Sequence, residues 1–156
     1  MRSIRFLYIF ELNDVKENLM LSQQRKDMIT ILKREVVPYL RSQQFQGSFP
    51  HFRRLQSDQI DLITFQFNRH GGSFIIELAQ ASAAGFQTYW GEQITPQKMT
   101  AHDVDVDARR RLGSHSSYED GIWFSYESAQ SEQDYIRVAQ QVIASFEQDV
   151  SHGAKK

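Results

Sequence analysis

Apolar residues recur at steps of three and four between residues 22 and 44, which is the spacing of one face of an α-helix. The stripe consists of Met28, Ile29, Leu32, Val36, Tyr39 and Leu40. Pro38 lies within it and lacks the backbone donor that a helix interior needs. We therefore expect a helix that kinks at Pro38, or a second short helix that has Pro38 in its first turn.

Residues 1–21 precede this helix and contain an apolar run from Ile4 to Phe10. The run is much shorter than the ~20 residues of a membrane span. It also lacks the long apolar core and the small-residue cleavage site of a signal peptide. We expect an edge strand or a peripheral segment here.

Residues 59–80 carry the strongest strand pattern. The apolar positions of the first strand are Ile60 and Leu62 on one face and Ile63, Phe65 and Phe67 on the other. This change of phase predicts a strand that is either bulged or covered on both faces. A turn at residues 68–72 ends in two glycines, and a return strand follows with Phe74, Ile76 and Leu78 in alternation. A shorter strand around Phe52 begins near Pro50, which suits a strand start or a sheet edge.

Apolar and charged residues alternate with a period of two across residues 103–113, which predicts a strand with one buried and one solvated face. The solvated face carries Asp103, Asp105, Asp107, Arg109 and Arg111. Arg110 then points to the apolar side. We expect the two arginines of the solvated face to pair across strands with Asp61 or Glu77.

The remaining segments complete the order of elements. Residues 81–101 form a long connection with a possible short strand at 86–90, and a last strand is expected at 122–127. Ser131 and Asp134 resemble a capping box at the start of a helix that ends near Val150, and residues 151–156 are expected to fray. The fold class is α+β: one antiparallel sheet of about five strands with an N-terminal and a C-terminal helix packed against it. We expect a single domain over residues 1–156, with its core at about 22–150.

Composition narrows the classes of function. Hydrophobic residues make up 40% and charged residues 24% of the chain, as in ordinary globular domains. The formal net charge of -1 argues against a nucleic-acid binder, which usually shows a basic excess. The chain has no cysteine, so disulfides and thiolate chemistry are excluded. We expect a cytoplasmic protein that binds neither nucleic acid nor membrane.

Three stretches of the sequence are similar to motifs of one known protein family. Residues 31–45 are similar to a helix ending in a Leu-Lys-x-x-Gly-Phe pattern, although Gln44 stands in the place of the glycine. Residues 52–54 and 63–67 are similar to an aromatic strand followed by an apolar strand. Residues 109–113 and 120–124 are similar to an Arg-x-Arg-Ile-Gly and Asp-x-Trp-Trp pair. Together they resemble DUF4304, a bacterial family of unknown function, over about residues 25–150. The resemblance implies an α+β domain without an established activity, whose members are suspected of partner roles such as immunity to secreted toxins.

Arg109 and Arg111, with Asp105, are the candidate ligand-binding residues, because guanidinium groups clamp phosphates and carboxylates through paired donors. Asp103, Asp105 and Asp107 have the spacing of a calcium loop. The glycine and glutamate that such a loop needs are replaced by Ala108 and Ser114. The five histidines show no zinc-site spacing. We therefore assign no metal, no cofactor and no catalytic residue.

Phe86, Tyr89 and Trp90 on the long connection, together with Trp123, are the candidate partner surface, because aromatic side chains are enriched at interfaces. The sequence favours a non-enzymatic protein-interaction domain of the immunity or adaptor type. Its partner is a protein such as a toxin, or a second copy in a homo-oligomer. The alternative is a binder of a small anionic ligand through the arginines of residues 103–113. A metal-dependent hydrolase using Asp103, Asp105, His102 and Arg111 ranks third.

Overall fold

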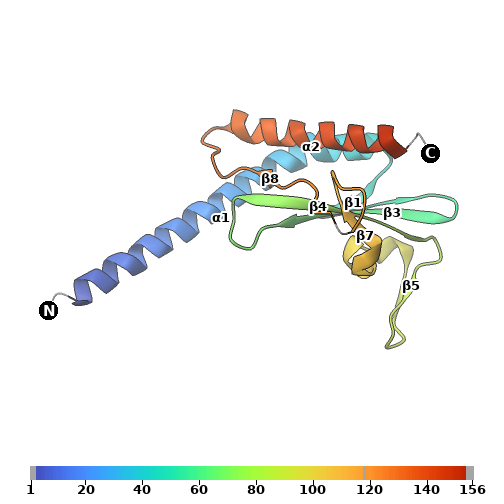
Figure 1. The fold of residues 1–156 in the computed structure, drawn as a ribbon, viewed down its shortest axis with the longest axis horizontal. Coiled ribbons are helices and arrows are strands. Elements are labelled where there is room, and N and C mark those ends of the chain that lie inside the picture. The colour runs from blue at the N-terminus through green and yellow to red at the C-terminus, as the bar shows by residue number, and fades with distance from the viewer. Residues whose placement is uncertain (1–2, 118, 154–156) are drawn as a thin grey trace.

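Two helices lie on one face of an antiparallel sheet (Figure 1). The computed structural model describes residues 3–117 and 119–153. Helix α1 spans Ser3–Ser42 and helix α2 spans Glu132–Gly153, and the two helices contact each other along the second half of α1. The α+β fold class is confirmed.

The main sheet has six strands. They are β1 (Gln46–Ser48), β2 (His51–Leu55), β3 (Gln59–Phe67), β4 (Ser73–Ser82), β7 (Arg109–Arg111) and β8 (Phe124–Ser125). The order is β1-β2-β3-β4-β7, and β8 pairs with β4 beside β7. The strands β5 (Phe86–Gln87) and β6 (Gln93–Ile94) form a separate hairpin. The sheet therefore has one strand more than the expected five, because β1 and β2 are distinct.

Strand β3 is covered on both faces, which explains the change of phase in its sequence. Its pairing with β4 runs without interruption from Gln59↔Ser82 to Phe67↔Phe74, so there is no bulge. Ile63 and Phe65 pack under α1 and α2 in the main core. On the other side, Ile60 and Leu62 form a second core with Met99, Ala101 and neighbouring residues. We call these the helix-covered face and the loop-covered face of the sheet.

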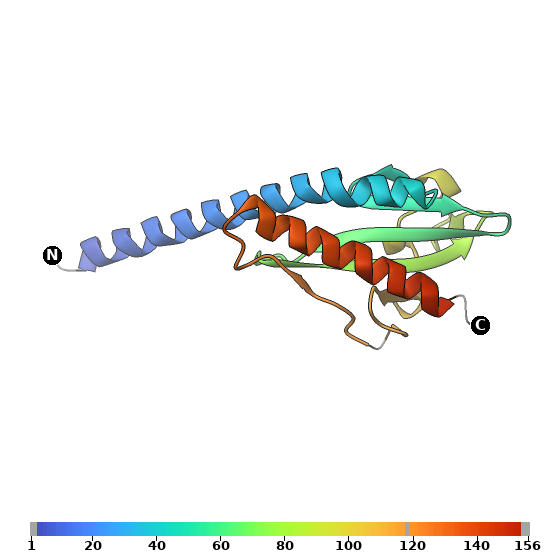
Figure 2. The same ribbon diagram turned by 90° about the horizontal axis from the view of Figure 1, so that it is seen from above.

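Helix α1 is much longer than the sequence predicts. Residues 3–21, expected as an edge strand or peripheral segment, continue the helix in the N-terminal direction. The helix also passes through Pro38 without ending, so the prediction of a second short helix is wrong. Figures 1 and 2 both show the first half projecting away from the rest of the molecule. Packing begins near Leu21, and Met28 and Leu32 are fully buried.

The predicted strand at 103–113 is wrong over most of its length. Only Arg109–Arg111 is strand, and short 3-10 helices occupy Ala101–Asp103 and Val106–Ala108. Asp103 explains part of this difference, because a short aspartate side chain that bonds to nearby backbone favours a turn over a strand. Asp103 accepts hydrogen bonds from the backbone N–H and the hydroxyl of Thr100. Val106, expected in the core, is 69% exposed.

The C-terminal helix begins as predicted and ends later. The Asp134 carboxylate accepts from the backbone N–H groups of Gln130 and Ser131, and the Ser131 hydroxyl accepts from the Asp134 N–H. This reciprocal pattern is a capping box. Residues 151–153, predicted to fray, are helical, and residues 154–156 lie outside the described part of the chain. Within the described part of the chain, no helix is long and apolar enough to cross a membrane.

Candidate functional site

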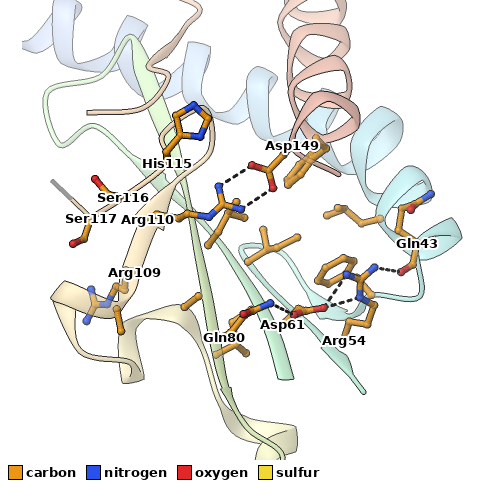
Figure 3. Close-up of a pocket in the computed structure, with 18 of the residues that line it drawn as sticks. Gln43, Arg54, Asp61, Gln80, Arg109, Arg110, His115, Ser116, Ser117 and Asp149 are labelled. Carbon is orange, nitrogen blue, oxygen red and sulfur yellow. Dashed lines mark hydrogen bonds and ion pairs between the residues drawn. The ribbon is translucent and has the colours of Figure 1, made fainter. Parts of the chain in front are cut away.

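A pocket of about 590 Å³ opens where the helices stop covering the sheet. It lies between the C-terminal ends of α1 and α2 and the helix-covered face of β2, β3 and β4 (Figure 3). Its apolar lining includes Leu40, Phe45, Ile63, Leu78 and Phe146. Its polar lining includes Gln43, Arg54, Asp61, Gln80, Arg110, His115 and Asp149. This volume lies within the usual range of small-molecule sites.

Strand alternation places the polar residues of this pocket. Asp61 lies on β3 in phase with Ile63 and Phe65, so it belongs to the helix-covered face. The register sets Asp61 opposite Arg54 of β2 and opposite Gln80 of β4. A polar row therefore crosses three strands on a face that is otherwise apolar.

Asp61 is the most heavily bonded side chain of the pocket. Its carboxylate accepts five hydrogen bonds, two from Arg54 and one each from Gln56, Gln59 and Gln80. Only 9% of the residue is exposed. A buried carboxylate needs such partners, because leaving water costs several kcal/mol. The carboxylate is thereby saturated, and Arg54 is the group that this end of the pocket presents.

The Arg54 guanidinium is fixed by three neighbours. It pairs with Asp61 at 2.8 Å, donates to the carbonyl of Gln43 at 3.1 Å, and lies 4.5 Å from the ring centroid of Phe45. Stacking and pairing together hold the side chain in one orientation. Its side chain is 30% exposed, so the guanidinium still borders the open space of the pocket.

A second arginine–aspartate pair closes the opposite end (Figure 3). Arg110 donates two hydrogen bonds of 2.7 Å to the carboxylate of Asp149 on α2, and a third of 3.2 Å to the Ser114 carbonyl. The two side chains are 36% and 27% exposed. This pair ties strand β7 to the end of α2. It is more solvated than the Arg54–Asp61 pair, so it stabilises the fold less.

A different polar group occupies the loop-covered face of the same strands. His51 shares a 2.9 Å hydrogen bond with Thr64, and Glu77 lies 3.6 Å from both His102 and Arg109. Burial, and then the nearby charges of His102 and Arg53, lower the pKa of His51. His51 is therefore neutral at pH 7. No set of three or more potential ligands for a metal ion occurs within residues 3–117 and 119–153.

The predicted ligand-binding residues do not meet in the large pocket. Arg109 lines one edge of it, but its guanidinium donates to the carbonyls of Val104 and His102 on the other face. Arg111 lies 5.4 Å from the Trp123 ring and donates to the Asp120 carbonyl. Asp105 is exposed at the start of a 3-10 helix.

A smaller hollow of about 170 Å³ does bring Arg109 and Arg111 together, but without Asp105. Glu77, Glu119 and Asp120 line the same hollow. These carboxylates offset the charge of the arginines. An anion would therefore meet little net attraction there.

The predicted partner surface divides into two places. Tyr89 and Trp90 lie at the tip of the β5–β6 hairpin, 96% and 64% exposed, with their ring centroids 4.7 Å apart. Phe86 lies at the base of this hairpin and packs against the second core. Trp123 is 48% exposed and stacks with Arg111 near the other end of the sheet. The hairpin projects from the loop-covered side in Figure 1.

Arg54, Gln80 and Asp149 were not predicted as site residues, and Asp61 was expected only as a cross-strand partner. One signal was present: Asp61 interrupts an apolar strand in phase with its buried residues. A charged residue at such a position is rare unless it is paired. Arg54 and Gln80 come from the two strands beside β3, and Asp149 comes from a helix, so their convergence follows from the topology.

Comparison with known protein families gives a match. The model of the family described as Domain of unknown function (DUF4304) matches residues 36–152. No curated protein and no solved structure matches the chain. The match covers more than half of the chain and includes both ends of the pocket. The chain therefore belongs to the DUF4304 family.

Proposed function

We propose that this protein is a binding domain that holds a small organic molecule in the pocket between Arg54 and Arg110. The observation that carries the proposal is the lining itself. An apolar floor is bordered at its two ends by oriented guanidinium groups. Ligand sites commonly combine a mostly apolar wall with a few fixed polar groups that set the orientation of the ligand.

Charge narrows the class of ligand. The charged lining consists of Arg54, Arg109, Arg110, Asp61, Asp107 and Asp149. These charges sum to zero, so the pocket does not attract a multiply charged anion such as a phosphate ester. Asp61 is saturated and Asp149 is engaged by two hydrogen bonds, so both ends present mainly donors. The ligand that fits is neutral or singly charged, with an apolar body and hydrogen-bond acceptors such as a carboxylate or amide carbonyl.

A thermal-shift screen of aromatic carboxylates and amides tests this function, with inorganic phosphate as the comparison probe. Binding to the native state alone stabilises it by about 2.7 kcal/mol at a hundredfold excess over Kd. Ala108→Trp fills the pocket from an exposed lining position. Ala84→Trp makes the same change on an exposed turn outside it.

We expect hits that raise the melting temperature of the wild-type and Ala84→Trp proteins but not of Ala108→Trp, and no shift with phosphate. A screen without hits would contradict the proposal. Equal shifts in Ala108→Trp would place the binding elsewhere.

A protein partner is the second candidate function, and the hairpin tip favours it. Two large aromatic side chains with this exposure are costly in water and are typical of contact residues. The Trp90 indole donates to Glu92 at 3.1 Å, which holds the ring in place without covering it. A toxin or other protein would contact Tyr89 and Trp90 directly.

Quantitative pull-down with the wild type and with a Tyr89→Ser/Trp90→Ser variant tests this second function. A stoichiometric protein that the wild type retains and the variant loses is expected. Phe86 stays unchanged, because it supports the hairpin from the second core. Identical recoveries would remove the hairpin tip as a contact surface.

A cytoplasmic location stays a prediction that cell fractionation would check.

A further inference from the structure

The projecting half of α1, residues 3–20, presents an apolar stripe to solvent. Leu12, Val15 and Leu19 are 46%, 55% and 65% exposed. Their steps of three and four place them on one face of the helix. Met20, 57% exposed, lies off this face. The structure thus leaves a row of large aliphatic side chains in water on a helix that extends beyond the domain (Figure 2).

The stripe ends where the domain begins. On the packed half of α1 the same face continues through Ser22, Lys26, Thr30 and Lys33, all of them exposed. Met28 and Leu32, which face the sheet, lie on the other side of the helix. The stripe therefore faces away from the sheet, and apolar pairing is confined to the projecting half.

We infer that this half of α1 pairs with the same segment of a second copy of the chain as a short parallel coiled coil. The sequence positions Tyr8, Leu12, Val15 and Leu19 fit the alternating core positions d, a, d and a of a heptad repeat. Two heptads of this kind form a limited seam, so the association is weak and depends on protein concentration.

The residues at the e and g positions beside the seam favour a second copy of the chain as the partner and a parallel orientation. In a parallel pair, each g position faces the e position of the next heptad on the other helix. The resulting pairs are Ile4 with Ile9, Glu11 with Lys16 and Asn18 with Gln23. Each is matched: apolar with apolar, acid with base, amide with amide. An antiparallel pair sets g against g and e against e, so Glu11 and Lys16 never meet.

The charge of this segment argues against a membrane surface as the occupant. Within residues 3–20 the basic residues are Arg5 and Lys16, and the acidic residues are Glu11, Asp14 and Glu17. The segment therefore carries a formal net charge of -1. Helices that lie on anionic membranes usually carry an excess of lysine and arginine on the polar face.

Sedimentation of the full-length protein over a range of concentrations tests the pairing. We expect the average mass to rise from the monomer toward twice that value, and Val15→Lys/Leu19→Lys to remain monomeric. Met20→Lys, a lysine substitution off the stripe, is the control and should associate like the wild type. Far-UV circular dichroism of the variants confirms that each is folded. A wild type that stays monomeric at all concentrations would overturn the inference.

Orientation is tested by cross-linking, which the absence of native cysteine makes clean. In a parallel pair, identical core positions face each other. Leu12→Cys and Leu19→Cys should therefore each form a disulfide-linked dimer under mild oxidation, and Met20→Cys should not. An antiparallel pair places at most one of the two core positions opposite itself. Cross-linking of only one core variant, or of neither, would overturn the parallel arrangement.

Discussion

The helix-covered face of the sheet has two ends that differ although the same strands form both. At the closed end, Phe65 and Phe74 lie buried beneath α1 and α2, in contact with further aromatic rings. At the pocket end, the alternation continues in phase to Asp61 and Gln80, which are polar. Polar residues in core phase thus mark the point where the helices stop covering the sheet. We expect the closed end to contribute most to stability, and we propose that the pocket end binds the ligand.

Truncating the closed end should have the largest effect on stability. Phe74 is fully buried and its ring centroid lies 5.1 Å from that of Phe67 and 5.3 Å from that of Phe124. Phe74→Ala leaves a cavity, and such changes cost about 3–5 kcal/mol. Denaturant unfolding would measure the loss. A cost below about 1 kcal/mol would mean that this end is not the stabilising one.

Removing the positive charge of Arg54, which faces Asp61, should have the next largest effect on stability. Arg54→Met takes away two of the five hydrogen bonds of a nearly buried carboxylate. Breaking a buried ion pair costs 3–5 kcal/mol, and the 30% exposure of Arg54 reduces this to about 2 kcal/mol.

The double variant Arg54→Met/Asp61→Leu is the control for this prediction. It removes both charges, so it should recover more than half of the lost stability when both variants are unfolded in denaturant. A double variant as unstable as Arg54→Met would show that the packing of Arg54 on Phe45, rather than its charge, stabilises this end.

The outer pair of the pocket should matter less for stability than the Arg54–Asp61 pair. Arg110 and Asp149 form two short hydrogen bonds, but both side chains are about a third exposed. Asp149→Asn should therefore cost less than about 1 kcal/mol in denaturant unfolding, and the loss should shrink as salt is added. A cost equal to that of Arg54→Met would remove the contrast between the two pairs.

The closed end was predictable from the sequence because apolar alternation reports burial directly. The hairpin at 59–80 and the capped C-terminal helix follow from local patterns, and cover on both faces of β3 was one of the two alternatives that its pattern allowed. The pocket was not predictable from the sequence, because its polar residues come from β2, β3, β4, β7 and α2. Their convergence depends on the strand order and on where the two helices end. Neither can be read from a local sequence pattern.

The errors have a common physical origin. A period of two at residues 103–113 suggested a strand, yet Asp103 bonds to the backbone of Thr100 and the segment folds into short 3-10 helices. Helix α1 has no acidic residue in its first turn, and residues 3–21 continue the helix of its packed half. In both segments, a local pattern was outweighed by side-chain bonding or by a neighbouring element.

The smallest predicted effect on stability concerns the loop-covered face of the sheet and depends on pH. His51 lies on β2 beside Phe52, but it points to the loop-covered face, where burial and the charges of His102 and Arg53 lower its pKa. A histidine whose folded pKa is below its unfolded value of about 6.5 binds protons more readily in the unfolded state. The free energy of unfolding should therefore fall as the pH is lowered from about 7 through 6.5 toward the folded pKa, and level off below it.

His51→Gln should flatten this pH dependence, because glutamine keeps a polar group near Thr64 but does not titrate. His70→Gln, on the exposed β3–β4 turn, is the matched control and should follow the wild-type profile. Urea unfolding at a series of pH values measures all three proteins. If the unfolding free energy of His51→Gln varies with pH as that of the wild type does, the pH-sensitive group is not His51. The loop-covered face then contributes no pH-dependent stability through this histidine, in contrast to the prediction.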